Sequence, residues 1–279
     1  MKPLLAGVRI IDLSRALAGP YGSLLLGDMG AEVIKVEEKL GDGTRGSLPR
    51  LEAGDGSYFI SVNRSKKSVA LDLTSNEGKQ VFHDLVRVSD VVYDNYRPKA
   101  LKKLGCDYES VKQINPRIIS CSVSGFGHTG EWQDQPAYDL IMQALGGAMS
   151  ITGEPDRPPV RMGIPMGDLA GGMFAALAIS AALFQRRVTG IGTEIDISLL
   201  DCQISLLCYL AQTYFFSGKI PGRQGSAHMM LPVYSAFETA DGYIVVASPG
   251  DRFWPKVCRA AGHTLGQKRR CAELPGWRN

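Results

Sequence analysis

Short apolar strands and an apolar helix alternate at the start of the chain. Val8–Leu13 reads VRIIDL, a compact apolar run that predicts a buried strand. Pro20 then suits the first position of a helix, because the missing N–H of proline costs nothing there, and Gly30 is a typical stop after a helix. Ala31–Val36 (AEVIKV) predicts a second strand. This succession indicates a βαβ unit and therefore a parallel sheet.

The same alternation continues to about residue 215. Further strands are predicted at Val69–Leu73, Asp90–Tyr93, Ile118–Val123 and Glu194–Ser198. Ser75 is expected to cap a helix whose apolar positions follow a helical period, namely Val81, Phe82, Leu85 and Val86. Other helices are predicted at Tyr138–Met149, Leu169–Arg187 and Leu199–Phe216. This order predicts an α/β fold, a Rossmann-like doubly wound parallel sheet forming one large domain over residues 1–215.

The pattern changes in the last part of the chain. Val233–Phe237 and Tyr243–Ala247 read as antiparallel strands around Asp241-Gly242, a strong signal of a β-hairpin. Phe253–Ala261 has a helical pattern, and the periodicity is lost from Gly262 onward. One hairpin and one helix bury little core. We therefore expect residues 216–279 to form a second, smaller and incomplete α+β domain.

Charge and cysteine content exclude several classes of protein. The 279 residues carry 31 Lys and Arg against 28 Asp and Glu, a net charge of +3, too mild to indicate a nucleic-acid partner. The six cysteines form no CxxC pair, so we expect no metal site and reduced thiols in the cytoplasm. No signal-peptide pattern is present at the N-terminus. The longest apolar run, Leu169–Phe184, has 16 residues, fewer than the ~20 that span a bilayer, so we expect a core helix and no membrane partner.

Two patterns point weakly to a ligand. The turn after the first predicted strand reads ALAGPYG and keeps only Gly19 and Gly22 of a dinucleotide fingerprint. Basic residues flank two predicted strand ends, where open α/β sheets bind ligands and where phosphates need positive charge: Arg64, Lys66, Lys67, Arg97, Lys99, Lys102 and Lys103. A solvated helix face explains the same charges equally well.

Asp168 is the sharpest single candidate for chemistry. It stands in the sequence GDLAGG, before the most apolar helix of the chain. One interpretation is a helix N-cap, for which Asp is favoured. The other is a carboxylate nucleophile, with Gly167, Gly171 and Gly172 leaving room for a substrate against the backbone. The residue and its neighbours leave both interpretations open.

Six segments, in this order, resemble the class III CoA-transferases, the family of formyl-CoA transferase and carnitine CoA-transferase that also contains α-methylacyl-CoA racemase. They are Leu4–Glu37, Asn63–Leu73, Asp90–Pro98, Asn115–Gly127, Ala137–Gly147 and Gly167–Gly172. The resemblance implies that Asp168 is the nucleophile. It would attack an acyl-CoA thioester and form first an aspartyl anhydride and then an aspartyl-CoA thioester, before CoA leaves on a carboxylic acid acceptor. The resemblance implies CoA thioesters as substrates and no permanently bound cofactor or metal.

The resemblance also implies a set of contacts to CoA, which map here to Leu17, Ala18, Leu71, Asp72, Leu73, Thr74, Asn95, Tyr96, Arg97, Lys103, Ala137 and Tyr138. Three positions depart from the family. Leu17 replaces a glutamine of formyl-CoA transferase, which argues against formyl or oxalyl specificity. Glu38 replaces an arginine that the family uses for the CoA phosphates. Tyr138 stands where the racemases have a catalytic histidine, and a tyrosine titrates near ~10, which favours a transferase over a racemase.

Length is the largest departure from the family. Its members are longer, and their chains complete the small domain and return to the large one, so that two rings interlock in a dimer. We therefore expect a homodimer for a full-length member, and we expect this chain to be truncated at its C-terminus. An acyl-CoA racemase or epimerase and an inactive truncated family member remain the alternatives to a CoA-transferase.

Overall fold

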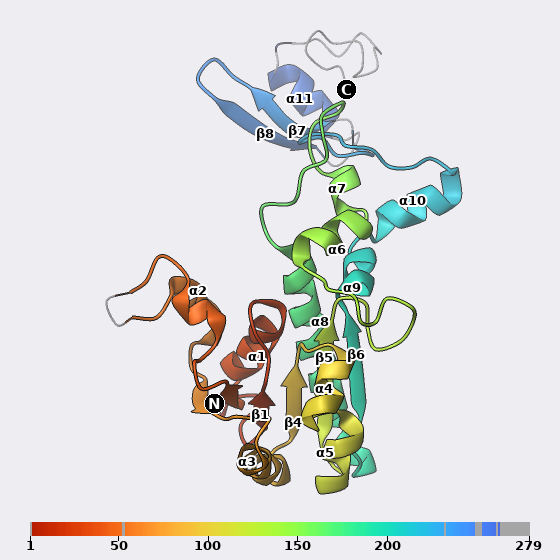
Figure 1. The fold of residues 1–279 in the computed structure, drawn as a ribbon. Helices are drawn as coiled ribbons and strands as arrows, with labels where there is room; N and C mark the ends of the chain where they lie inside the picture. The colour runs from red at the N-terminus through yellow and green to blue at the C-terminus, as the bar shows by residue number, and fades with distance from the viewer. Residues whose placement is uncertain (1, 52–53, 232, 249–252, 261, 263–279) are drawn as a thin grey trace. The chain divides into compact units, whose positions relative to one another are not determined.

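Figure 1 shows a computed structural model of the chain, which describes residues 2–51, 54–231, 233–248, 253–260 and 262. The chain divides into two compact units, one of residues 1–147 and 163–208 and the other of residues 148–162 and 209–279. The sequence pattern placed a single boundary at residue 215. Residues 148–162 go with the second unit because backbone contacts tie them to it: the N–H of Gly225 donates to the carbonyl of Gly153 at 2.9 Å.

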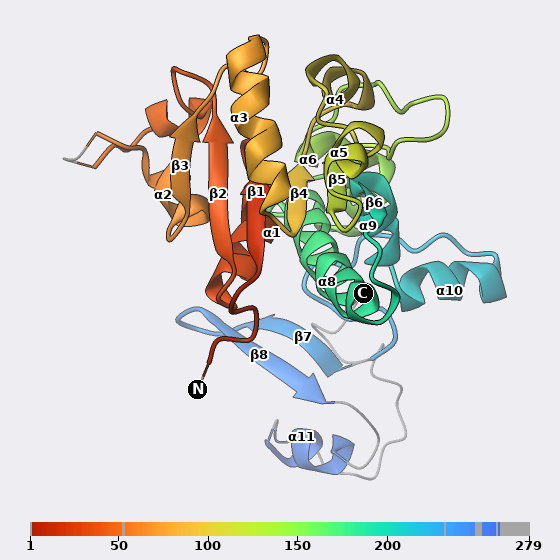
Figure 2. The same ribbon diagram turned by 90° about the horizontal axis from the view of Figure 1, so that it is seen from below.

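The first unit is built on a sheet of six parallel strands, as the sequence predicted. Their order across the sheet is β3-β2-β1-β4-β5-β6, which Figure 2 shows from β3 on the left to β6 on the right. This is the order of a doubly wound sheet, with its switch point between β1 and β4. The bounds are β1 Arg9–Asp12, β2 Glu32–Glu37, β3 Lys67–Ala70, β4 Val91–Asp94, β5 Ile119–Ser124 and β6 Glu194–Ser198.

Helices cover both faces of this sheet and close two separate cores. On one face α1 (Ala18–Asp28) and α8 (Met166–Thr189) pack over Ile10, Tyr93 and Ile119. On the other face lie α3 (Asn76–Arg87), α4 (Pro98–Leu104) and α5 (Tyr108–Ile114), over apolar residues such as Ile11, Val36 and Val92. The remaining helices of this unit are α2 (Ser57–Asn63), α6 (Asp139–Leu145), α9 (Leu199–Ser205) and the short 3-10 helix η1 (Gly43–Gly46).

Helix α8 is the long apolar helix that the sequence indicated. Within the described residues it is the one helix long and apolar enough to cross a membrane. Its inner side, however, contributes Ala175, Ile179 and Leu183 to the core beneath the sheet. An added Cβ on Gly172 would lie 2.7 Å from the carbonyl oxygen of Ala18, so α8 and α1 cross with their backbones close together. This packing agrees with the predicted core helix.

Two predicted helices are wrong in extent. The apolar stretch Leu199–Phe216 is not one helix: α9 ends at Ser205, and α10 (Tyr209–Ser217) begins after Cys208, whose φ of 46° is left-handed and breaks the helix. The stretch Tyr138–Met149 is likewise interrupted after α6, at Gly147, whose φ is 84°. The sequence patterns missed α2, α4 and α5, each of which is only seven residues long.

The second unit contains α7 (Ala148–Ile151), α10, an antiparallel hairpin and α11 (Trp254–Ala260). The hairpin pairs β7 (Val233–Glu238) with β8 (Tyr243–Ser248) and confirms the strands predicted around Asp241-Gly242. Its turn is closed by the N–H of Thr239, which donates to the carbonyl of Gly242 at 2.8 Å. The predicted loss of periodicity after Gly262 falls on residues 263–279, outside the described part of the chain.

Candidate active site

The turns that follow β1 and β4 meet at the switch point of the sheet. The backbone N–H of Arg15 donates to Asn95 Oδ1 at 2.8 Å, and Asn95 Nδ2 donates back to the carbonyl oxygen of Arg15 at 2.8 Å. Open α/β sheets bind ligands in the crevice outside the carboxyl ends of their strands at this point. The reciprocal pair of hydrogen bonds joins the two turns into one wall of that crevice.

A buried ionic network holds the first of these turns. Asp12, at the end of β1, accepts hydrogen bonds from Ser23 Oγ at 2.6 Å and Lys66 Nζ at 3.0 Å, and also from Ser14. Burial alone would raise the pKa of Asp12, but the charges of Lys66 and Lys35 together with the serine hydroxyls lower it to about 2. Asp12 is therefore ionised, as a buried carboxylate with full hydrogen bonding can be.

The two lysines of this network also reach the backbone of the turn. Lys35 Nζ donates to the carbonyl oxygen of Ser14 at 2.7 Å and lies 3.0 Å from Asp42 Oδ2. Lys66 Nζ donates to the carbonyl oxygen of Pro20 at 2.9 Å. The segment between Ser14 and Pro20, which contains the predicted contacts Leu17 and Ala18, is thus fixed at both of its ends.

The larger cavity of the crevice, which we call the Asp168 pocket, has a volume of about 620 Å³. Its walls come from the turns after β1, β4 and β5, the loop before α6 and the first turn of α8. The lining residues are Arg15, Ala16, Leu17, Ala18, Asn95, Tyr96, Arg97, Ala100, Val123, Ser124, Gly125, Gln133, Gln135, Pro136, Ala137, Tyr138, Asp168 and Leu199.

Asp168 is not the cap of its helix. Helix α8 begins at Met166 after Pro165, and Asp168 stands in its first turn. The backbone N–H of Gly167 instead donates to Asp139 Oδ1 at 2.9 Å, and that of Asp168 to the same atom at 3.4 Å. The N-cap interpretation of Asp168 is therefore wrong, because a carboxylate from α6 already occupies that end of the helix.

The carboxylate of Asp168 accepts no hydrogen bond from any residue that the structure describes. Burial raises its pKa to about 6, and the neighbouring charge of Asp139 adds to that effect. The charge of Asp168 also affects Tyr58 on α2. Burial raises the pKa of the Tyr58 phenol, and the negative charge of Asp168 raises it further. A half-buried carboxylate with a perturbed pKa and no hydrogen bond, at the wall of a cavity, has the properties of a functional group.

The glycines around Asp168 do not open space for a substrate, contrary to the expectation from sequence. A Cβ on Gly167 would lie 3.1 Å from Asp139 Oδ1, and one on Gly171 would lie 2.2 Å from Leu199 Cδ2. Gly172 faces α1, as described above. All three serve close packing of α8 against its neighbours, and none of them lines the pocket.

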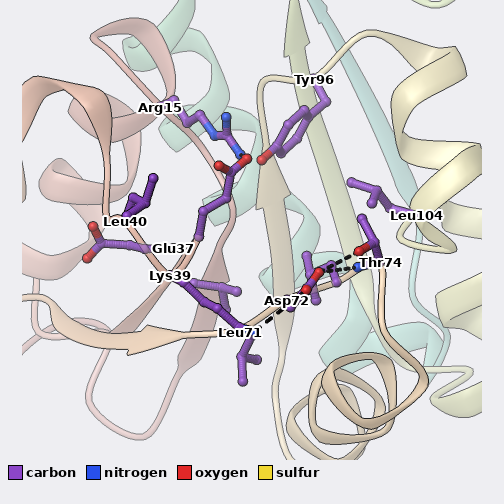
Figure 3. A pocket seen from close by; sticks show the side chains of 12 residues that line it. Arg15, Glu37, Lys39, Leu40, Leu71, Asp72, Thr74, Tyr96 and Leu104 are labelled. Atoms are coloured by element: carbon purple, nitrogen blue, oxygen red, sulfur yellow. Dashed lines mark hydrogen bonds and ion pairs between the residues drawn. The ribbon is translucent and has the colours of Figure 1, made fainter.

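A second cavity of about 360 Å³ lies beside the ends of β2 and β3, and we call it the Asp72 pocket (Figure 3). Arg15 Nη2 donates to Glu38 Oε1 at 2.5 Å, and its guanidinium carbon lies 5.1 Å from the centre of the Tyr96 ring. Lys39 Nζ lies 3.9 Å from Asp72 Oδ2. The lining residues are Arg15, Val36, Glu37, Glu38, Lys39, Leu40, Leu71, Asp72, Leu73, Thr74, Tyr96 and Leu104.

The structure distributes the predicted site residues over these two cavities. The predicted residues that line the Asp168 pocket are Leu17, Ala18, Asn95, Tyr96, Arg97, Ala137, Tyr138 and Asp168. Those that line the Asp72 pocket are Leu71, Asp72, Leu73, Thr74 and again Tyr96. Lys103, in the last turn of α4, lines neither of them. Sequence reasoning missed Arg15, which lines both; its place in the turn after the first strand was the available signal.

Several members of the predicted basic cluster have other partners. Lys66 is buried against Asp12, as described above. Arg64, Lys67 and Lys99 form exposed ion pairs with Asp28, Glu32 and Asp134. Of this cluster, Arg97 lines the Asp168 pocket. The cations that line the two pockets are Arg15, Lys39 and Arg97, and of these Arg15 and Lys39 face the carboxylates of Glu38 and Asp72.

Known proteins resemble this chain over most of its length. Succinate–glutarate CoA-transferase of Agrobacterium fabrum is 42% identical over 268 residues, 94% of this chain and 67% of that protein. Succinyl-CoA:glutarate CoA-transferase of Mus musculus is 44% identical over 260 residues, 93% of this chain and 59% of that protein. The chain therefore spans about three-fifths to two-thirds of the length of these relatives.

A crystal structure shows the same fold. It is that of a CAIB/BAIF family protein from Brucella suis, which superposes with a TM-score of 0.85 at 41% identity and covers 92% of this chain and 69% of that one. The family model described as CoA-transferase family III matches residues 5–279. With this match, and with relatives above 40% identity, the chain belongs to CoA-transferase family III.

Proposed function

We propose that this protein transfers CoA from an acyl-CoA donor to a carboxylic acid acceptor, with Asp168 as the nucleophile. The observation that carries the proposal is the Asp168 carboxylate itself, at the wall of the Asp168 pocket with no hydrogen bond from the described residues. An unbonded carboxylate is free to attack an electrophile, and covalent catalysis divides one hard step into easier ones. The relatives named above are CoA-transferases of dicarboxylic acids, which supports the same chemistry here.

CoA is long enough to need both cavities, and we assign its nucleotide end to the Asp72 pocket. Arg15 and Lys39 would turn from their partners Glu38 and Asp72 to its phosphates there, because charge-assisted hydrogen bonds are the strong contacts for such groups. Tyr96 would pack against its apolar or aromatic parts. Since Arg15 and Tyr96 line both cavities, the pantetheine arm would pass them and bring the thioester to Asp168. The predicted contacts Leu17, Ala18 and Asn95 would border that path.

The proposed reaction runs through two covalent intermediates. An oxygen of Asp168 attacks the thioester carbonyl carbon, the carbon–sulfur bond breaks, and CoA leaves as a thiolate with a mixed anhydride formed. The thiolate then attacks the aspartyl carbonyl carbon and expels the donor as a free carboxylate, leaving an aspartyl-CoA thioester. The acceptor carboxylate repeats the sequence in reverse. Its oxygen displaces the thiolate to form a new anhydride, and the thiolate takes the acceptor acyl group and frees Asp168.

Dicarboxylic acids are the proposed substrate class, with a succinyl-type donor. The names of the relatives specify succinate, glutarate and, for a Haloarcula hispanica protein 43% identical to this chain, mesaconate. Arg97, Gln133 and Gln135 are among the residues that line the Asp168 pocket, and their guanidinium and amide groups would bind a second carboxylate. These groups fit an acid with a polar far end better than a purely aliphatic acyl chain.

The racemase alternative requires a base that removes the α-proton of the acyl group. Tyr138 stands where that base would be, and 74% of this residue is exposed. A phenol is in general a poorer choice of base for this step than an imidazole, which disfavours the racemase. We keep the racemase and the inactive family member as outcomes of the test. The homodimer also remains a proposal, which light scattering on the purified chain would check.

The decisive test is to incubate the purified chain with succinyl-CoA and isotopically labelled carboxylic acids, including glutarate, and to follow new acyl-CoA by mass spectrometry. We expect labelled thioester with wild type, and none with Asp168→Asn, which keeps the shape of the side chain. Asp84→Asn serves as a matched control, because Asp84 is an exposed aspartate on α3 that lines neither pocket. Deuterium incorporated at the α-carbon without an acceptor would favour the racemase. A folded protein that gives neither product would contradict both enzymatic functions.

A further inference from the structure

The contact between Asp139 and the first turn of α8 joins two helices that are distant in the sequence. The first N–H groups of any helix have no partner inside the helix. At α8, Pro165 supplies no side-chain cap, and Asp139 Oδ1 accepts the N–H groups of Gly167 and Asp168 instead. The negative charge of Asp139 also lies at the end of the helix where the backbone dipole favours it.

Asp139 is held in place from both sides of this contact. Its second oxygen, Oδ2, accepts a hydrogen bond from Gln143 Nε2 at 2.7 Å, and Gln143 is fully buried one turn later on α6. On the side of α8, a Cβ on Gly167 would lie 3.1 Å from Asp139 Oδ1 and 3.2 Å from Met142 Cβ. The two helices therefore meet at close range, and the carboxylate of Asp139 has little freedom to turn away.

This arrangement has two consequences for Asp168. Because the end of α8 is already capped, the Asp168 carboxylate need not fold back onto its own backbone, and it accepts no hydrogen bond from the described residues. The nearby negative charge of Asp139 also disfavours the resting carboxylate. That penalty is relieved when Asp168 attacks, since the charge then moves onto the acyl group and the departing thiolate.

On the basis of the function proposed above, we infer that Asp139 is the positioning residue of the site. Its carboxylate caps α8 in place of Asp168, keeps the Asp168 carboxylate unbonded at the pocket wall, and makes it more reactive through like charge. Asp139 takes no covalent part in the reaction.

Other charged or titratable groups lie at the same pocket or within electrostatic range of Asp168. Tyr58 on α2 lies within its electrostatic range, and Arg15, Arg97 and Tyr138 line the same pocket from the turns after β1 and β4 and from the start of α6. Substitution of Asp139 leaves all four unchanged. The effect of Asp139 is therefore separable from theirs.

The test compares Asp139→Asn and Asp139→Ala in the full chain. The asparagine keeps an oxygen that can accept the N–H of Gly167 but loses the charge and the acceptor that Gln143 Nε2 uses, whereas alanine removes the cap as well. Asp107→Ala is the matched control, because Asp107 caps α5 through Ser110 and lies outside both pockets. The readouts are the melting temperature, kcat and KM with succinyl-CoA and glutarate, and a ¹³C NMR titration of the Asp168 carboxyl, identified by its loss in Asp168→Asn.

We expect Asp139→Asn to lower the pH at which Asp168 titrates and to lower kcat about tenfold, with KM for succinyl-CoA unchanged. Asp139→Ala should reduce kcat further, about a hundredfold in total, because the nucleophile loses its orientation. Its melting temperature should fall by a few degrees, roughly 2–4 °C. Asp107→Ala should show the same fall in melting temperature with wild-type kcat.

The inference is overturned if Asp168 titrates at the same pH in wild type and Asp139→Asn and if kcat per folded molecule is unchanged in Asp139→Ala. Asp139 would then be a structural cap like Asp107. Failure of the proposed function looks different, because wild type itself would then form no Asp168-dependent thioester. In that case the NMR titration, which needs no turnover, still decides whether Asp139 acts on Asp168.

Discussion

The Nζ atom of Lys66 lies 3.0 Å from Oδ2 of Asp12, and only 2% and 0% of the two side chains is exposed. Both charged groups are buried away from solvent, and each is stabilised by the other and by the hydrogen bonds around them. A buried pair of this kind is costly to break from one side, since the remaining charge is left without a partner.

Lys66→Met should therefore destabilise the first unit strongly. Breaking a buried ion pair typically costs about 3–5 kcal/mol. The adjacent Lys67 offers a matched control, because it pairs with Glu32 at 2.5 Å but 71% of its side chain is exposed. Lys67→Met should cost less than about 1 kcal/mol. Urea unfolding of the two variants measures both free energies, and equal losses would contradict this account of the network.

Acid should weaken the same network. Burial raises the pKa of Asp12, but Lys66, Lys35 and two hydroxyls outweigh it and lower the pKa from 3.8 to about 2. A carboxylate whose pKa is lower in the folded state stabilises the fold above its unfolded pKa and loses that contribution as the pH falls. We expect the free energy of unfolding to fall between pH 4 and pH 2. An Asp12→Asn variant that still folds should be less stable than wild type at pH 7. Its free energy of unfolding should also change less between pH 4 and pH 2.

Asp94, at the end of β4, should give the opposite dependence on pH. Burial raises its pKa to about 7, against the hydrogen bonds from Ser122 Oγ at 2.7 Å and the N–H of Tyr96 at 3.0 Å. A raised pKa in the folded state means that stability is lost as the pH rises through that value. Wild type should therefore lose about 3 kcal/mol between pH 5 and pH 8.5, and Asp94→Asn, which does not ionise, should not show this loss. Denaturant titrations at the two pH values measure the free energies of unfolding. The same difference between the two proteins at both pH values would contradict the raised pKa of Asp94.

Arg15 should carry much of the proposed affinity for CoA. Removing a hydrogen bond to a charged group costs about 1.5–3 kcal/mol, so Arg15→Met should raise KM for succinyl-CoA about tenfold or more. Arg9→Met is the control, because Arg9 also forms an ion pair, with Glu32 at 2.6 Å, but lines neither pocket. Calorimetric binding of free CoA gives the same comparison without turnover. Equal affinities of Arg15→Met and Arg9→Met for CoA would show that Arg15 does not bind the CoA phosphates.

The rate of acyl transfer should depend on the ionisation of Asp168. Burial and the charge of Asp139 raise its pKa to about 6, and only the ionised carboxylate is a nucleophile. We expect kcat/KM to fall tenfold per pH unit well below pH 6, as for one ionising group. A rapid-mixing experiment with succinyl-CoA over pH 4.5–8 measures it. A profile that is flat below pH 6 would exclude Asp168 as the titrating group.

Local signals were sufficient for much of the sheet. The strands β1 and β6 and the helix capped by Ser75 follow directly from apolar runs and a capping residue, and Ser75 Oγ does accept the N–H of Gly78 at 3.0 Å. The break between α9 and α10 could not be predicted in this way, because the apolar pattern runs through Cys208 without interruption.

In the candidate site, too, local sequence signals predicted some features and not others. Asp168 stood out in the sequence because of its place before the apolar helix. The role of Asp139 was hidden, since the hydrogen bond to Gly167 joins residues 28 positions apart, and neither position shows a pattern of its own. The glycines beside Asp168 were misread for the same reason: their neighbours on α6, α9 and α1 come from other parts of the chain.

The pair of hydrogen bonds between Arg15 and Asn95 bridges 80 positions of sequence, and β4 must lie beside β1 before it can form. Closing so long a loop is slow compared with making a helix. During refolding, helical circular dichroism should therefore recover before the ability to bind CoA does. A chain that emerges gradually during synthesis would remain unable to bind CoA until both turns had been made, however well its first helix had already formed.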